Sequence, residues 1–283
     1  GKLTQEDYIV CISDLNQFIP SYSYLYNNNN HNINNNHNNN HNNEKDIPQR
    51  SFYAVFDGHG GNHASQFLAT SFYIKLAQHP KICTQPLIAL QDTWKAMETE
   101  LHTYCRSGDK FLRDGSTATV CLIISSVIYI TNCGDSSAHI QMTDGTHSIV
   151  TELHNTLNHE EVERCESAGG KVMLRNTPST IFSCCLPFRI IPVMPELLQP
   201  RVYPGGLLIT RSFGDFYAKD SILGGVPGSV ICDHGQIRMF TLSRDIKYVV
   251  LASDGVWDAL SPQEIFQIID DCFTDHYNNH KII

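Results

Sequence analysis

Charge is scarce in this sequence, and positive charge is the scarcer of the two. Asp, Glu, Lys and Arg make up 17% of the 283 residues, and 29 acidic against 20 basic side chains give a formal net charge of −9. A general nucleic-acid-binding protein would carry a basic face, so the composition argues against that class. No apolar run approaches the roughly 18–20 residues of a membrane span, and no basic-then-apolar leader opens the chain. We therefore expect a soluble monomer without nucleic-acid partners or membrane spans.

Two common motifs are also absent. No G-x-x-x-x-G-K-[ST] segment occurs, the nearest approach being Gly169-Gly170-Lys171-Val172, which excludes a P-loop nucleotide site. The ten cysteines include no C-x-x-C pair, the spacing typical of zinc and redox sites. Several lie in apolar runs, as Cys121 does within residues 119–123, where a thiol behaves as a small hydrophobe. The pattern favours a reducing compartment, cytoplasmic or nuclear.

Two segments interrupt an otherwise ordinary globular composition. Asparagine occupies 13 of the 17 positions in residues 27–43, and such a tract buries too little apolar area to offset the entropy of ordering it. We expect a disordered insertion over about residues 22–46. Six of the twelve prolines fall within residues 176–204. A long loop of this kind is either functional or a plain surface insertion, and the sequence leaves both open.

The remaining signals predict strands and helices in alternation. Short β-prone runs occupy residues 8–13, 51–56 and 246–252, and two adjacent runs at 116–124 and 127–132 indicate an antiparallel hairpin. Helical patterns cover residues 62–77, 86–106, 158–168 and 262–273, with Asn62 able to cap the first. Hairpins without a repeated βαβ unit predict mainly antiparallel sheets flanked by helices.

Carboxylates recur where the predicted strands end. A strand ending in Asp-Gly projects a carboxylate from the sheet rim and lets a backbone carbonyl approach the same point. Several such ends brought together form an all-oxygen site, which selects Mg²⁺ or Mn²⁺ over zinc. Two such ions about 3.5–4 Å apart can clamp a phosphoryl group. Three carboxylates stand in this context, in Asp57-Gly58, Gly134-Asp135 and Asp254-Gly255; in addition, Glu6-Asp7 precede the first predicted strand and Asp258 lies four residues after Asp254.

The residues around these carboxylates resemble the metal-dependent type 2C family of serine/threonine protein phosphatases. Seven blocks occur in the family's order and cover nearly the whole chain outside the two interruptions. They are Gly1-Lys-Leu-Thr-Gln-Glu-Asp7, Ala54-Val-Phe-Asp-Gly-His-Gly-Gly61, Asp114-Gly-Ser-Thr-Ala118, Asn132-Cys-Gly-Asp-Ser-Ser-Ala138, Glu160-Glu with Ala168-Gly-Gly170, Thr210-Arg-Ser-Phe-Gly-Asp215 and Leu251-Ala-Ser-Asp-Gly-Val-Trp-Asp-Ala-Leu-Ser261. The resemblance implies an α+β fold in which two packed, mainly antiparallel sheets form a central β-sandwich flanked by helices on both sides.

The resemblance also implies a place for each metal ligand. Asp57 matches the carboxylate that bridges two Mg²⁺ or Mn²⁺ ions, and the Gly58 carbonyl and Glu6 match ligands of the second ion. Asp254 matches a ligand of the first ion. The acidic positions that can hold a weaker third ion in this family are matched by Asp135 and Asp258.

The implied reaction is dephosphorylation of phosphoserine and phosphothreonine in proteins. A metal-bridging hydroxide attacks phosphorus directly, and His59 matches the general acid that protonates the leaving alkoxide. Lys2 stands where the family places a phosphate-binding Arg; lysine binds phosphate as a point charge, without the bidentate fork of arginine. The Pro-rich residues 176–204 lie where the family carries its flap.

One departure and two rivals accompany this interpretation. The family's final Asp-Asn motif is not found before Ile283, so residues 1–283 are expected to be a single catalytic domain that lacks its C-terminal part. The first rival is a pseudophosphatase, or phosphoprotein-binding regulatory module, with the same fold. The second is a cysteine phosphatase, because residues 232–238 place Cys232 and Arg238 at Cys-x₅-Arg spacing.

Overall fold

The computed structural model describes residues 5–20, 48–106, 111–174, 199–232 and 236–279. Lys2, the Asn-rich insertion and most of the Pro-rich segment lie outside these ranges. The interpretations given above for those three features therefore stay predictions.

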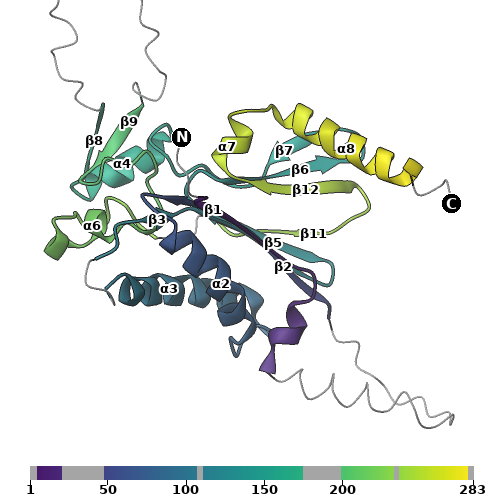
Figure 1. Ribbon diagram of the computed structural model, residues 1–283, viewed down its shortest axis with the longest axis horizontal. Helices are drawn as coiled ribbons and strands as arrows, with labels where there is room; N and C mark the ends of the chain where they lie inside the picture. Colours follow the sequence, from purple (N-terminus) through teal and green to yellow (C-terminus); the bar gives the residue numbers. More distant parts are fainter. Residues whose placement is uncertain (1–4, 21–47, 107–110, 175–198, 233–235, 280–283) are drawn as a thin grey trace, which may run out of the picture.

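Two antiparallel sheets form the centre of the molecule (Figure 1). The larger has seven strands in the order β10-β3-β2-β4-β5-β11, with β1 paired to the other edge of β2, and the smaller has the order β12-β6-β7. The strands of the larger sheet are β1 (Asp7–Ile12), β2 (Arg50–His59), β3 (Gly115–Ser116), β4 (Ala118–Ile124), β5 (Val127–Cys133), β10 (Phe213–Gly214) and β11 (Arg238–Thr241). Those of the smaller are β6 (Ser137–Met142), β7 (His147–Ile149) and β12 (Ile246–Ala252).

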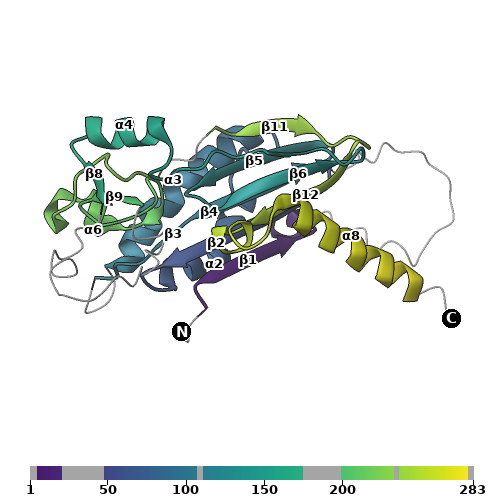
Figure 2. The same cartoon turned by 90° about the horizontal axis from the view of Figure 1, so that it is seen from above.

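Helices cover both outer faces of this sandwich. On the larger sheet, Phe52 and Phe56 of β2 pack against Phe72 of α2 (His63–Ala77), which in turn packs against Trp94 of α3 (Pro86–Cys105). On the smaller sheet, Tyr248 of β12 stacks on Phe273 of α8 (Pro262–Asn279). Figures 1 and 2 show these helices on opposite sides, so the predicted α/β/β/α layering is confirmed.

A second group of elements gathers at one end of the sandwich in both views. It comprises α4 (His159–Ser167), α6 (Phe216–Lys219) and a two-stranded sheet of β8 (Lys171–Leu174) and β9 (Pro200–Tyr203). The remaining short elements are the 3-10 helices η1 (Leu15–Phe18) and η3 (Ser221–Leu223), and α7 (Asp254–Trp257). β8 and β9 flank the residues of the Pro-rich segment that lie outside the description.

The structure changes two of the predicted boundaries. The strand predicted over residues 116–124 is split at Thr117, whose hydroxyl accepts a hydrogen bond from the Asp57 N–H at 3.2 Å, while its own N–H donates to the Asp57 carbonyl at 2.8 Å. The helix predicted to end at residue 273 continues to Asn279. The first difference depends on Asp57, a neighbour that is remote in the sequence.

The cap of α2 also differs from the expectation. Asn62 makes no side-chain cap hydrogen bond. The Asp114 carboxylate instead accepts from the N–H groups of His63 and Ala64, at 2.7 and 3.1 Å. A buried carboxylate at a helix start satisfies otherwise unpaired donors and complements the helix dipole. The cap therefore comes from a residue some fifty positions along the chain.

We expect Asp114→Ala to lower the free energy of unfolding by about 2 kcal/mol, because two buried N–H groups lose their acceptor. Urea unfolding followed by circular dichroism measures this. Asn62→Ala is the matched control and should change the free energy by less than about 0.5 kcal/mol. Equal losses in the two variants would contradict the assignment of the cap.

Candidate metal centre

Strand register brings the predicted carboxylates to one end of both sheets. Asp7 lies opposite Asp57 in the β1–β2 pair, and Ala252 lies opposite Ser137 in the β12–β6 pair. The Ser253 hydroxyl donates to the Asp7 carboxylate at 3.3 Å, which joins the end of the smaller sheet to the edge of the larger one. Asp254 is the next residue and begins α7. Positions far apart in the sequence thus share one rim.

The electrostatics of Asp57 show how closely these groups interact. Burial raises the pKa of Asp57 to about 8, and the hydrogen bond and charge of Asp7 and the charges of Asp254 and Asp135 add to this effect. Burial and the charge of Asp254 likewise raise the pKa of Asp135 to about 6, with a further contribution from Asp258. Carboxylates that disfavour one another's ionisation in this way form a site of strong negative potential.

Gly58 and Glu6 meet beside Asp57. The Gly58 N–H donates to the Glu6 carbonyl at 3.1 Å, and the Ser65 hydroxyl donates to the same carbonyl at 2.6 Å. A Cβ added at position 58 would stand 2.5 Å from the Ser65 hydroxyl and 2.6 Å from the Glu6 carbonyl, so only glycine fits. This close approach brings the backbone of Glu6 against the strand end that carries Asp57.

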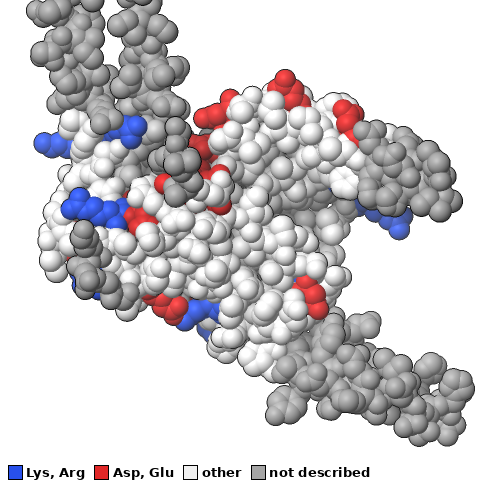
Figure 3. All heavy atoms as spheres, in the orientation of Figure 1, with Lys and Arg blue, Asp and Glu red and all other residues white. Residues whose placement is uncertain are grey.

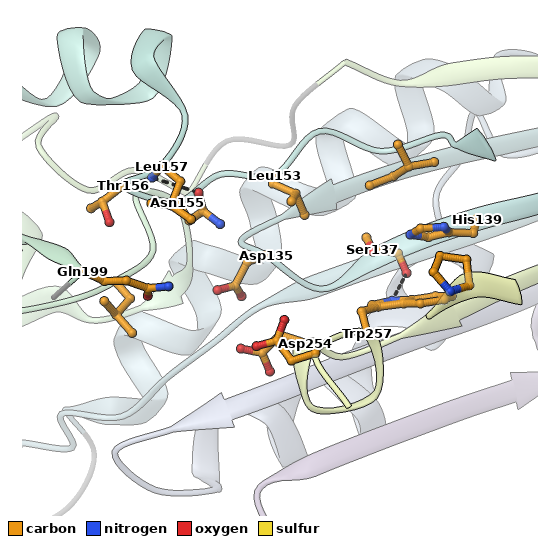
Figure 4. A pocket seen from close by; sticks show the side chains of 14 residues that line it. Asp135, Ser137, His139, Leu153, Asn155, Thr156, Leu157, Gln199, Asp254 and Trp257 are labelled. Carbon is orange, nitrogen blue, oxygen red and sulfur yellow. Dashed lines mark hydrogen bonds between the residues drawn. The ribbon is translucent and has the colours of Figure 1, made fainter. Parts of the chain in front are cut away.

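A cavity of about 420 Å³ opens beside these carboxylates. Figure 4 shows Asp135 and Asp254 projecting toward the same space, with Trp257 and His139 stacked at the far end, ring centroids 3.9 Å apart. Leu153 and Leu157 line another wall. Figure 3 shows acidic side chains gathered on the surface around α7. The space therefore combines an acidic end with an apolar one.

The donor chemistry fits hard divalent cations. Among the described residues, no three His, Cys, Asp or Glu side chains already converge closely enough to hold an ion. The oxygen-only character of the group and the raised pKa values of Asp57 and Asp135 nevertheless suit Mg²⁺ or Mn²⁺, because a cation offsets the repulsion between carboxylates. Asp57, Asp254, Asp135 and Asp258 are among the side chains available to such ions.

His59, at the end of β2, has a partner that the sequence analysis did not identify. Its Nε2 lies 2.7 Å from Oδ2 of Asp215, whose side chain is completely buried. Burial lowers the pKa of His59, but the charge and hydrogen bond of Asp215 outweigh this and raise it overall. Asp114 and Asp215 both stand beside glycine in the quoted blocks, the same signal that marked the other carboxylates. Their side chains turn inward and serve as internal acceptors.

A buried ion-pair network supports the segment that leads to Asp215. Glu161 of α4 accepts from Arg211 at 2.6 Å, from the Thr210 hydroxyl at 2.7 Å and from Arg164 at 3.0 Å. Burial alone would raise the pKa of Glu161, but these hydrogen bonds outweigh it and bring the pKa to about 2. The network ties α4 to residues 210–211, which directly precede Ser212.

The cysteine-phosphatase rival is disfavoured by the surroundings of Cys232. Burial and the neighbouring Cys133 raise the pKa of the Cys232 thiol well above its usual value. A catalytic cysteine must be a thiolate, which needs the opposite environment. Cys232 therefore lacks the activation that such an enzyme requires.

The fold and the site define an α/β/β/α sandwich with an acidic, cation-suited rim at one end. The family model described as "Protein phosphatase 2C" matches residues 26–283, and the chain belongs to that family. In the part of the chain that the structure describes, no helix combines the length and the apolar character that crossing a bilayer demands.

Curated relatives and solved structures agree with this assignment. The chain is 27% identical over 230 residues to "Probable protein phosphatase 2C 52" of Oryza sativa subsp. japonica, covering 79% of this chain and 38% of that protein. It is 28% identical over 213 residues to "Probable protein phosphatase 2C 45" of the same organism, covering 75% and 62%. The chain thus spans about half the length of the curated relatives it matches.

The similarity to solved structures concerns the fold. A serine-threonine phosphatase 2C from Toxoplasma gondii superposes with a TM-score of 0.67 at 18% identity, covering 98% of this chain and 81% of that one. A C. elegans sex determining protein superposes with a TM-score of 0.63 at 18% identity, covering 95% and 53%. Both comparisons extend across nearly the whole of this chain.

Proposed function

We propose that this chain is a metal-dependent serine/threonine protein phosphatase that hydrolyses phosphoserine and phosphothreonine. The observation that carries the proposal is the electrostatic interaction among Asp57, Asp135 and Asp254 at one rim, which with burial raises the pKa of Asp57 to about 8 and that of Asp135 to about 6. Membership of the protein phosphatase 2C family supports the reaction class. The free cysteines among the described residues suit the reducing, cytoplasmic or nuclear location that we also propose.

Different residues would bind the ions and the phosphate. Asp57, the Gly58 carbonyl, Glu6 and Asp254 would hold two Mg²⁺ or Mn²⁺ ions, and Asp135 with Asp258 could take a weaker third. When bound, the ions supply Lewis-acid chemistry, neutralising phosphoryl oxygens and activating the attacking water. Lys2 would bind the phosphate as a point charge.

His59 would complete the reaction by protonating the leaving oxygen. A serine or threonine alkoxide is a poor leaving group, so a proton delivered in the transition state lowers the barrier. The raised pKa of His59 keeps a larger fraction of the ring protonated at neutral pH. Its partly exposed ring at the end of β2 lies beside Asp57 in the sequence and within reach of its charge.

Metal removal tests the proposal. We expect the chain to hydrolyse a phosphothreonine peptide with Mn²⁺ or Mg²⁺, and EDTA to reduce turnover by at least about 100-fold, because the ions carry the charge neutralisation. Inorganic phosphate release measures this. Alkylation with iodoacetamide is the control and should leave turnover within about twofold, since Cys232 is a partly buried thiol whose pKa is raised well above its usual value.

Each other outcome has a definite meaning. Turnover that resists EDTA but is lost on alkylation would contradict the proposal in favour of the cysteine mechanism. Binding of the phosphopeptide without phosphate release at any metal concentration would identify the chain as the phosphoprotein-binding module of the same fold.

A further inference from the structure

His59 and Asp215 form a contact that also bears on the orientation of the His59 ring. The Nε2 of His59 lies 2.7 Å from Oδ2 of Asp215, and 156 positions separate the two residues. The side chain of Asp215 is 0% exposed, whereas that of His59 is 30% exposed. A buried carboxylate is thus paired with the inner nitrogen of a histidine whose ring reaches the surface of the site.

The donors around Asp215 determine which nitrogen of His59 carries the proton. The Ser212 hydroxyl donates to the same Oδ2 atom at 2.6 Å. An ionised carboxylate only accepts hydrogen bonds, so Nε2 of His59 must also be a donor. Nε2 is therefore committed to Asp215, and Nδ1 is the nitrogen left for a substrate.

The backbone holds Asp215 in a conformation that few residues adopt. Its φ is +50°, in the left-handed region, and Gly214 before it has a φ of +74°. A Cβ added at Gly115 would collide with both the Asp215 carboxylate and Nε2 of His59, so this position requires glycine. A strained non-glycine residue next to a predicted active-site histidine is typical of a site that the surrounding structure maintains.

A partly buried ion pair between Lys219 and Glu98 also holds the turn. Lys219 donates to Glu98 and to the Ser212 carbonyl, each at 2.7 Å, and the Gly214 N–H donates to Glu98 at 3.0 Å. The turn that presents Asp215 is thus attached to α3 through Glu98 and to α6 through Lys219. Such attachment limits the movement of the carboxylate relative to His59.

We propose that Asp215 is the positioning residue of His59, holding Nε2–H inward and turning Nδ1 toward the leaving oxygen of the substrate. The inference rests on the proposed function. In the step concerned, water oxygen bonds to phosphorus as the bond from phosphorus to the seryl or threonyl oxygen breaks, and both hydrogens of that water stay on the phosphate that is released. The electron pair stays on that oxygen, which takes the Nδ1 proton of the imidazolium. The neutral ring keeps its Nε2–H on Asp215.

Leaving-group dependence tests this role. Asp215→Asn is expected to lower kcat for a phosphothreonine peptide by about 100-fold with KM unchanged, the lower end of what general acids contribute. With 4-nitrophenyl phosphate the loss should stay below about fivefold, because nitrophenolate departs without a proton. A misfolded or metal-free site would slow both substrates equally, so equal losses would overturn the inference.

A nearby aspartate provides the matched control. Asp220 lies five positions on, and its carboxylate accepts from the Ile222 N–H at 2.8 Å and from Arg106 at 3.2 Å. Asp220→Asn should leave the ratio of the two kcat values within twofold of wild type. A change in that ratio as large as the Asp215→Asn effect would also overturn the inference.

A spectroscopic measurement separates this inference from the proposed function. In metal-free protein, two-dimensional ¹H–¹⁵N spectra should show His59 with a protonated Nε2, and Asp215→Asn should abolish that signature. His59→Gln identifies the signal. If wild type shows the signature but no turnover, the proposed function fails while the positioning stands. If the His59 signal is the same in wild type and Asp215→Asn, the positioning is overturned, whatever the turnover.

Discussion

Asp57→Asn is expected to reduce metal-dependent turnover of a phosphothreonine peptide by at least about 1,000-fold, equivalent to about 4 kcal/mol of transition-state stabilisation. Asp57 is the carboxylate on which the others converge, since Asp7, Asp135 and Asp254 all raise its pKa. An asparagine of the same shape removes the charge that Asp57 would supply to the ions. Asp254→Asn should cause a comparable loss.

The same variants separate a lost site from a lost fold. In EDTA, Asp57→Asn should unfold at the same temperature as wild type, because without an ion the raised pKa of Asp57, about 8, leaves its carboxyl mostly uncharged at pH 7. Added Mn²⁺ should raise the melting temperature of wild type only, since an ion stabilises a protein in proportion to its affinity for the folded state. Asp245→Asn, at an exposed position before β12, is the control for both measurements. Full turnover in Asp57→Asn would defeat the proposal.

The sequence predicted what depends on local pattern. The strand over Ile246–Ala252 and the antiparallel pairing of β4 with β5 follow from runs of apolar residues, and the structure contains both. Three of the rim carboxylates, Asp57, Asp135 and Asp254, are indicated by their place at the end of such a run beside glycine. Register then brings them together, as the Asp7–Asp57 pairing shows, but it was the resemblance to a family that indicated which of them belong to one site.

The remainder could not be predicted, because it depends on pairs of residues that only the complete topology brings into contact. Asp114 caps a helix that begins at His63, and Asp215 meets His59 across 156 positions. Nothing in the local sequence of either aspartate distinguishes it from Asp57 or Asp254. Whether a carboxylate at a strand end faces solvent or the interior is decided by the elements that pack over it.

Glu161→Gln is the variant with the largest expected effect on stability, a loss of about 3 kcal/mol in the free energy of unfolding. Glu161 is 4% exposed. Its carboxylate accepts hydrogen bonds from Arg211, Arg164 and Thr210. Removing one partner of a buried ion pair leaves the other partners desolvated and uncompensated, which costs roughly 3–5 kcal/mol. Urea unfolding at pH 7 measures the difference.

Glu163→Gln, two positions along the same helix, is the matched control. Its carboxylate is 68% exposed and pairs only with His159, at 3.4 Å, so the expected change is below about 0.5 kcal/mol. Similar losses in the two variants would show that α4 itself, not the buried network, is the source of the stability.

The difference in unfolding free energy between wild type and Glu161→Gln should depend on pH, which gives a second, independent check of the role of the Glu161 charge. Folding brings the pKa of Glu161 from 4.5 to about 2, so the charged carboxylate stabilises the folded state. That contribution is fully present above pH 4.5 and is lost as the pH falls toward 2, because the carboxyl group then takes up a proton in the folded state as well. The gap in unfolding free energy between wild type and Glu161→Gln should therefore be constant from pH 7 to about 5 and shrink below that. The network anchors residues 210–211, which lead to Ser212 and Asp215. If the difference in unfolding free energy did not shrink in acid, something other than the charge of Glu161 would hold those residues in place.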